Sequence, residues 1–198
     1  MKGKIKLIGV YDYTVILTYM SLCFAMLGML SALEGKYTAS ILCLVGAGVC
    51  DAFDGIVARS KKNRTDDEKA FGIQLDSLCD VISFGVFPAF LCYFMGMKGI
   101  LGIVIICLYS LCAVIRLAFF NVLEAKRQQT ETGCAKFYRG LPVTSISILL
   151  PFVYLFKAVL PEQIFIGILY GLMLLVAFLF VYDFSVPKPD WKKILTGK

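Results

Sequence analysis

The stretch from Asp51 to Asp80 reads DAFDGIVARSKKNRTDDEKAFGIQLDSLCD and joins two strongly apolar segments. Four carboxylates sit inside or at the mouth of those segments: Asp51, Asp54, Asp76 and Asp80. A charged side chain in the middle of a membrane helix costs roughly 2.5–3.5 kcal/mol, so four of them would cost on the order of 10 kcal/mol. Something must neutralise these charges, and a divalent cation is the obvious candidate.

The chain as a whole has the composition of a polytopic membrane protein. Of its 198 residues, 59% are hydrophobic, and long apolar runs recur along nearly the whole chain. A soluble domain would be nearer half apolar. We therefore expect an all-α integral membrane protein that forms a single domain over residues 1–198. The net charge of +6 then favours contact with anionic membrane lipids and not with nucleic acid.

Two residue types narrow the possible chemistry. The chain contains no His, which excludes a His general base, a His nucleophile and a His metal ligand. Its eight Cys form no CxxC pattern, and nearly all of them lie in apolar runs. We interpret them as reduced side chains that pack between helices.

The apolar runs predict a six-transmembrane-helix bundle. The expected spans cover residues 14–33, 38–59, 71–95, 99–120, 141–159 and 163–184. The first run follows a basic N-terminus, but it is long enough to cross a bilayer and no small-residue cleavage pattern follows it. We therefore interpret it as the first span and not as a signal peptide.

The distribution of Lys and Arg predicts the orientation of the spans. Basic residues gather before the first span, between the second and third, between the fourth and fifth, and after the sixth. The opposite side carries only Lys36, Lys98 and Lys157. Because basic loops stay in the cytoplasm, we expect both termini and the mouth of the carboxylate stretch to face the cytoplasm, in the cell membrane.

Helical spacing predicts that the four carboxylates meet. Asp51 and Asp54 share one face of the second span, and Asp76 and Asp80 share one face of the third. A short polar connection makes these helices antiparallel neighbours, so both pairs lie at a similar depth. An oxygen-only cluster suits Mg²⁺, Mn²⁺ or Ca²⁺ better than Zn²⁺. Four carboxylates can hold two such ions, as in phosphoryl-transfer sites.

The neighbouring residues favour a phosphate-bearing ligand. Gly55 and Ala58 are small, so a ligand can approach the helix closely, and Arg59 offers a forked cation for phosphate. Two alternatives remain open at this point. The carboxylates could pair with Arg59, Lys61 and Lys62 as a structural charge network, or they could line the path of a cation transporter.

The pattern Asp51-x-x-Asp54-Gly55-x-x-Ala58-Arg59, followed by Gly72-x-x-x-Asp76-x-x-x-Asp80, resembles the signature of the CDP-alcohol phosphotransferases. The resemblance implies a six-span enzyme, a homodimer, that transfers a phosphatidyl or similar group from a CDP-linked donor to an alcohol and releases CMP. It also implies Mg²⁺ or Mn²⁺, with two ions. The connection between Arg59 and Gly72 is longer than is usual in the family. We expect its extra residues, within 63–69, to form a cytoplasmic bulge.

The continuation of the signature resembles one branch of that family. Residues 76–89, DSLCDVISFGVFPA, are similar to the corresponding run of the phosphatidylserine synthases. Phosphatidylglycerophosphate synthases tend to carry Pro and Lys where this chain has Ser77 and Val81. Residues 116–121, RLAFFN, and the run from Gly140 to Pro142 also resemble the serine branch.

The resemblance implies roles for individual residues. Asp51, Asp54 and Asp76 would bind metal, and Asp80 would border the second metal and accept the proton of the serine hydroxyl. A further group would contact the CDP-diradylglycerol donor: Gly55, Ala58, Arg59, Thr18, Thr14 and Thr65. Thr18 matches a Thr of the family's first span, and Thr14 stands in for an Asn that is replaced here by Val15.

The site for the serine carboxylate needs a cation. Arg116 is the candidate inside the fourth span, because an ionisable residue in a membrane helix points to function. Arg139 and Lys136, just before the fifth span, are alternatives. Arg116 could instead pair with one of the Asp residues. Glycerol phosphate or inositol phosphate remain alternative acceptors for the same chemistry.

Overall fold

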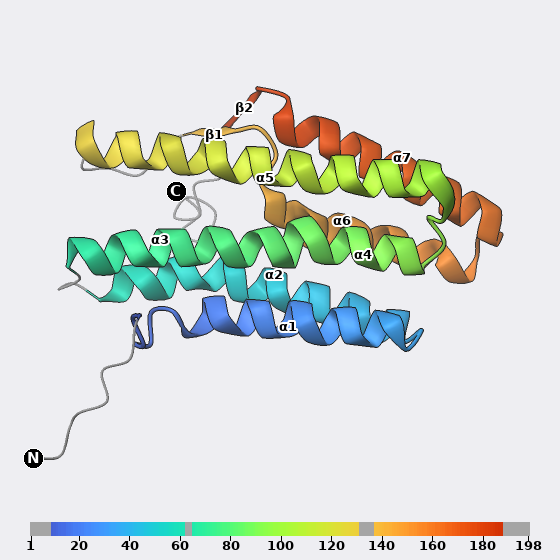
Figure 1. Cartoon of the computed structure of the whole chain (residues 1–198), viewed down its shortest axis with the longest axis horizontal. Helices are drawn as coiled ribbons and strands as arrows, with labels where there is room; N and C mark the ends of the chain where they lie inside the picture. The colour runs from blue at the N-terminus through green and yellow to red at the C-terminus, as the bar shows by residue number, and fades with distance from the viewer. Residues whose placement is uncertain (1–8, 62–64, 131–136, 188–198) are drawn as a thin grey trace, which may run out of the picture.

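The protein is an elongated bundle of helices that lie roughly side by side (Figure 1). A computed structural model describes residues 9–61, 65–130 and 137–187. The helices are α1 Ile16–Leu33, α2 Tyr37–Ser60, α3 Asp66–Asp80, the π-helix η1 Val81–Val86, α4 Phe87–Phe94, α5 Gly99–Thr130, the 3₁₀-helix η2 Val143–Ser145, α6 Ile146–Leu155, the 3₁₀-helix η3 Phe156–Ala158 and α7 Glu162–Val181. Strands β1 Phe137–Arg139 and β2 Ser185–Pro187 pair antiparallel.

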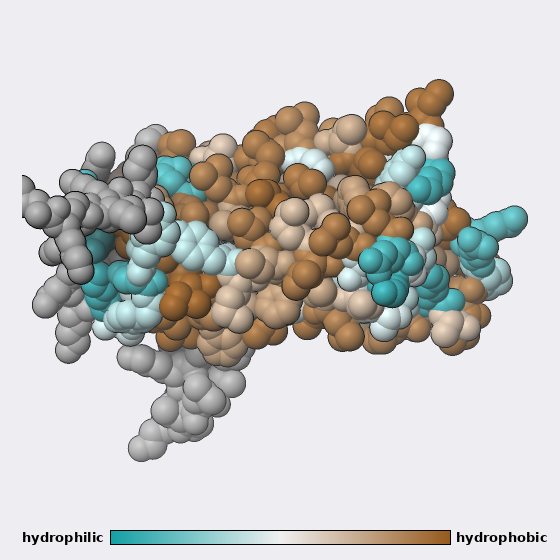
Figure 2. All heavy atoms as spheres, turned by 60° about the horizontal axis from the view of Figure 1, so that its bottom comes forward, coloured by the Kyte–Doolittle hydropathy of each residue, from teal (hydrophilic) through white to brown (hydrophobic). Residues whose placement is uncertain are grey.

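Five helical stretches are long and apolar enough to cross a membrane: Ile16–Leu33, Tyr37–Ala58, Asp66–Phe94, Gly99–Ala125 and Glu162–Val181. This finding supports the expected helical membrane protein, to which the structure adds the short β1–β2 pair. The sixth expected span, residues 141–159, corresponds to the shorter apolar helix Val143–Ala158, which does not reach the same length. Figure 2 shows the matching surface, with hydrophobic side chains over the middle of the bundle and hydrophilic ones towards its ends.

The expected bulge within residues 63–69 is wrong where the structure describes it, because residues 66–69 form the first turn of α3. Thr65 Oγ1 accepts a hydrogen bond from the backbone N–H of Glu68 at 3.2 Å, and a Glu68 carboxylate oxygen accepts one from the N–H of Thr65 at 3.1 Å. This capping box satisfies two donors of the helix end. Acidic side chains in the first turn also interact favourably with the helix dipole. Residues 66–69 therefore belong to the helix and not to a bulge.

Helices α3, η1 and α4 form one continuous helical stretch, which changes from an α-helix to a π-helix directly after Asp80. Residues Val81–Val86 form a π-helix, and α4 begins with Pro88 in its first turn. Pro88 has no N–H, so the carbonyl of Phe84 lacks the hydrogen-bond donor that residue i+4 of an α-helix would supply. The Tyr109 hydroxyl donates to that carbonyl at 2.7 Å, and the Ser110 hydroxyl donates to the next carbonyl, Gly85, at 3.0 Å. Side chains of α5 thus stabilise the wide turn.

Small residues bring the helices close together around the carboxylates. A Cβ on Gly28 of α1 would lie 2.1 Å from the Phe87 ring, and a Cβ on Gly48 of α2 would lie 2.2 Å from Ser147 Oγ. Helix α6 therefore packs against α2 one turn before Asp51. On the other side of the bundle, α5 packs against α7 (Figure 1).

Gly48→Ala should destabilise the protein, because the new methyl group would overlap both Oγ and Cβ of Ser147. Overpacking of this kind costs about 1–3 kcal/mol. Thermal unfolding in detergent measures the effect. Gly167→Ala is the matched control, since no described atom lies within 4 Å of that Cβ position. Equal unfolding temperatures for the two variants would contradict the close α2–α6 contact.

Candidate functional site

The structure brings three of the four predicted carboxylates together. One oxygen each of Asp51, Asp76 and Asp80 lies within 4.8 Å of the other two. Asp51 comes from the second half of α2, and the other two come from α3, so the cluster forms only when these helices are neighbours. Asp80 is buried, with 8% of its surface exposed. The carboxylates of Asp51 and Asp80 are close enough to hydrogen-bond to each other.

Asp54 adjoins this cluster. Its carboxylate is close enough to that of Asp76 for a hydrogen bond. Thr18 of α1 donates from its hydroxyl to Asp54 Oδ2 at 3.3 Å. Like Asp80, Asp54 is 8% exposed. The four carboxylates thus form a continuous group between α1, α2 and α3.

The chemistry of this group fits a divalent metal. Asp76 Oδ1 is buried and has no hydrogen-bond partner among the described residues. A buried carboxylate oxygen without a donor is costly, and a metal ion would satisfy it. All the candidate ligands are carboxylate oxygens, which favours Mg²⁺ or Mn²⁺.

The alternative of a structural charge network is weakened by Lys61. Its ammonium group donates to Asp12 at 2.7 Å and to Glu68 at 3.1 Å, and not to the four carboxylates. The other two cations of that hypothesis, the Lys62 residue and the Arg59 side chain, lie outside the described part of the structure.

The predicted nucleotide contacts fall in different places. Gly55 and Ala58 continue α2 beyond the carboxylates and are partly buried. Thr18 contacts Asp54, as described above. Thr14 is 3% exposed, and its hydroxyl donates to Asp12. Thr65 is exposed and caps α3, which is a structural role.

Sequence reasoning missed the contact that ties residues 10–15 to the carboxylate helices. Asp12, before α1, pairs with Lys61 after α2, which in turn pairs with Glu68 in α3. The hydrogen bond from Lys61, with a smaller effect from Thr14, lowers the pKa of Asp12 to about 2. The hydrogen bond that Lys61 donates to Asp12, followed in size by the one to Glu68, raises the pKa of Lys61. The sequence around Asp12 does not predict this ion pair, because its partner Lys61 lies far along the chain.

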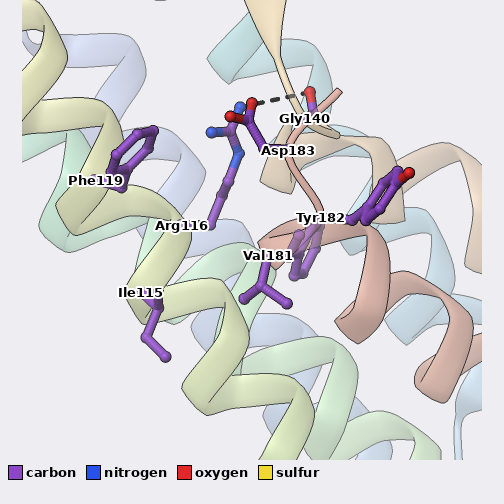
Figure 3. A pocket seen from close by; sticks show the side chains of 8 residues that line it. Ile115, Arg116, Phe119, Gly140, Val181, Tyr182 and Asp183 are labelled. Atoms are coloured by element: carbon purple, nitrogen blue, oxygen red, sulfur yellow. Dashed lines mark hydrogen bonds between the residues drawn. The ribbon is translucent and has the colours of Figure 1, made fainter. Parts of the chain in front are cut away.

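Arg116 lies in a cavity of about 290 Å³ between α5 and the end of α7. Its side chain is buried, with Nε donating to the Leu141 carbonyl at 3.1 Å and Nη2 to the Gly140 carbonyl at 3.5 Å. Figure 3 shows Asp183 beside its guanidinium. Among the described residues, its charged neighbour is therefore Asp183 and not one of the four clustered carboxylates. Arg139 lies in β1, and its side chain is outside the description.

Hydrogen bonds between α3 and α5 fix the depth of Arg116. The Ser77 hydroxyl donates to Asn121 Oδ1 at 2.8 Å, and Ser110 donates to the Gly85 carbonyl at 3.0 Å. The two helices run antiparallel, so Arg116 stands at about the level of Asp80. The cation and the carboxylate group therefore share one depth in the bundle.

Comparison with known proteins identifies similar chains. The family model described as CDP-alcohol phosphatidyltransferase matches residues 13–193. A CDP-diacylglycerol–serine O-phosphatidyltransferase of Methanocaldococcus jannaschii is 30% identical over 184 residues, which cover 92% of this chain and 76% of the relative. An archaetidylserine synthase of Methanothermobacter thermautotrophicus is 36% identical over 130 residues, or 65% of this chain and 52% of the relative.

A CDP-diacylglycerol–serine O-phosphatidyltransferase of Mycobacterium tuberculosis is 34% identical over 127 residues, or 64% of this chain. The matched stretch is 43% of that relative. The chain therefore spans about half the length of several curated relatives that it matches.

Asp12→Asn should lower stability by a pH-dependent amount. Because the folded state lowers the pKa of Asp12 from 3.8 to about 2, its stabilising effect is complete above about pH 4 and disappears as the pH falls to about 2. The pair is partly exposed, so we expect about 1 kcal/mol or less. Thermal unfolding of wild type and variant between these pH values measures the difference. A difference that persists at pH 2 would contradict the ion pair.

Proposed function

The chain belongs to the CDP-alcohol phosphatidyltransferase family, and on that premise we propose that it transfers the phosphatidyl group of CDP-diacylglycerol, or of an ether-lipid analogue, to the hydroxyl of L-serine. The products are phosphatidylserine and CMP. The observation that carries this proposal is the meeting of Asp51, Asp76 and Asp80, with ligand oxygens within 4.8 Å of one another. Those residues occupy the positions of the family signature.

The carboxylate group would hold the metal. Asp51, Asp54 and Asp76 are the proposed ligands, and Asp80 would border the second of two Mg²⁺ or Mn²⁺ ions. A bound divalent ion supplies charge stabilisation for the pyrophosphate of the donor and for the departing CMP. The unpartnered oxygen of Asp76 supports this assignment.

Asp80 is the proposed catalytic base. Its carboxylate takes the proton of the serine hydroxyl while the hydroxyl oxygen forms a bond to the lipid-side phosphorus. The bond from that phosphorus to the bridging oxygen breaks, and its electron pair leaves with CMP. Burial of Asp80 keeps bulk water from the reacting oxygen, which favours transfer to the alcohol over hydrolysis.

The donor would bind along α2 with its tails in the bilayer. Gly55 and Ala58 present little side chain, so the CDP moiety can approach the helix backbone. Thr18 orients Asp54 through its hydrogen bond and borders the same space from α1. Arg59, Thr14 and Thr65 remain predicted contacts, and the capping role of Thr65 makes it the least direct.

Arg116 is the proposed partner of the serine carboxylate. Two of its five N–H donors bind backbone carbonyls, and the guanidinium lines a cavity at the depth of Asp80. The names of the relatives support serine as the acceptor. Arg139 remains a predicted second contact.

We also propose the arrangement of the chain in the cell membrane. Val143–Ala158 would be the sixth span, because apolar residues flank it on both sides. The distribution of Lys and Arg places both termini and the carboxylate group on the cytoplasmic side. The family resemblance further predicts a homodimer.

CMP release from CDP-diacylglycerol measures the reaction directly. We expect release with serine and Mg²⁺ or Mn²⁺, loss of release with excess chelator, and recovery when the metal is restored. Ion flux without CMP release from any alcohol would favour a cation transporter. Release with glycerol phosphate or inositol phosphate but not with serine would contradict the proposed acceptor.

Asp80→Asn should reduce CMP release by at least about 100-fold, because general-base catalysis contributes roughly that much or more. Binding of CDP-diacylglycerol should be partly retained, since the other three carboxylates remain. Asp67→Asn is the control, as Asp67 is exposed in the first turn of α3. If Asp80→Asn turns over at the wild-type rate, Asp80 is not the base.

A further inference from the structure

We propose that Asp183 binds the ammonium group of the acceptor, so that Arg116 and Asp183 together form a site for a zwitterionic amino acid. This inference rests on the proposed function, since it concerns the acceptor of that reaction. It adds the residue that selects an amino acid over an alcohol that carries only negative charge.

The first support is the placement of the two charges. Asp183 follows α7 by two residues, and Arg116 lies in the middle of α5, yet both line the same cavity. Figure 3 shows their side chains directed towards one another. The guanidinium is close enough to be influenced by the charge of Asp183. A cation and an anion therefore stand side by side in a space of about 290 Å³.

The second support is the character of the remaining walls. Arg116 and Asp183 are the charged members of a lining that is otherwise apolar, aromatic or Gly: Ile115, Phe119, Gly140, Phe180, Val181 and Tyr182. Arg116 is buried whereas Asp183 is exposed, so the two charges are presented by a space that is open on the side of Asp183. Gly140 keeps the space beside the guanidinium open, because a Cβ there would lie 3.5 Å from Arg116 Cζ. The cavity can thus hold a small ligand that carries both charges.

The two charges match the charges of an α-amino acid. The serine carboxylate complements Arg116, and its ammonium complements Asp183. A phosphate-bearing alcohol has a doubly negative group and no cation, so the charge of Asp183 would repel it. Specificity often comes from such an unfavourable contact with the wrong ligand.

The cavity lies at the depth of the carboxylate group. Arg116 and Asp80 lie at the same depth, as the α3–α5 hydrogen bonds show. Residues 140–145 connect the two places, because Arg116 binds the carbonyls of Gly140 and Leu141 and the chain then enters η2 and α6. Helix α6 packs on α2 at Gly48, one turn from Asp51.

Steady-state kinetics of Asp183→Asn with two acceptors tests the assignment. The acceptors are L-serine and 3-hydroxypropionate, which is serine without its ammonium group. If 3-hydroxypropionate is not turned over, we measure its inhibition constant in competition with serine. We expect wild type to favour serine. In Asp183→Asn the KM for serine should rise at least tenfold, with kcat changed by less than about twofold, while the constant for 3-hydroxypropionate changes little.

Two further variants complete the experiment. Asp183→Glu keeps the charge and should recover most of the serine affinity. Asp67→Asn removes a different exposed carboxylate and should leave both constants unchanged. The KM for CDP-diacylglycerol should stay the same in every variant, which separates a change in acceptor binding from a general loss of structure.

The possible failures are distinguishable. If wild type releases no CMP with serine, the proposed function is wrong and this subsite falls with it. If wild type uses serine but Asp183→Asn leaves its KM unchanged, or weakens serine and 3-hydroxypropionate equally, only the role of Asp183 is wrong. If Asp183→Asn does not fold, equal constants for the two acceptors in wild type would overturn the ammonium contact.

Discussion

The approach of four carboxylates inside a membrane bundle is the constraint on which the rest of the structure depends. One oxygen each of Asp51, Asp76 and Asp80 lies within 4.8 Å of the other two, and like charges this close repel strongly where water is scarce. Helices α2 and α3 therefore stay together only if other contacts hold them. Those contacts surround the group. Gly48 lets α6 press on α2, the capping box orders the start of α3, and Lys61 joins the ends of both helices to Asp12. The carboxylate group is thus a property of the whole arrangement of α1, α2 and α3.

Arg116 follows a different principle. Arg116 lies in α5 against two backbone carbonyls and Asp183, and not beside the four clustered carboxylates. Separation prevents the guanidinium from neutralising the carboxylates, which would compete with a divalent ion. Arg116 lies at about the depth of Asp80, with its guanidinium bound to the carbonyls of Gly140 and Leu141.

Much of this could be predicted from the sequence because its signals are local. The i, i+3 and i, i+4 spacings of the carboxylates, the apolar runs and the signature residues all lie within short windows. The features that were missed depend on distant partners. Asp12 becomes significant only beside Lys61, and Asp183 only beside Arg116. The start of α3 was misjudged because a polar sequence can form either a bulge or a capped helix, and the reciprocal bonds of Thr65 and Glu68 decide between them.

The π-helix at Val81–Val86 has a consequence for how this rod can change. One additional residue in a turn rotates everything beyond it by about 100° relative to an uninterrupted α-helix. The direction in which α3 presents Asp76 and Asp80 is therefore offset from the direction in which α4 presents Phe87 and Leu91 to the core. Substitutions that retune the packing of α4 need not turn the carboxylates away from their partners. The continuous helix thus has two parts that present their side chains in different directions. Tyr109 and Ser110 stabilise the π-helical turn between them.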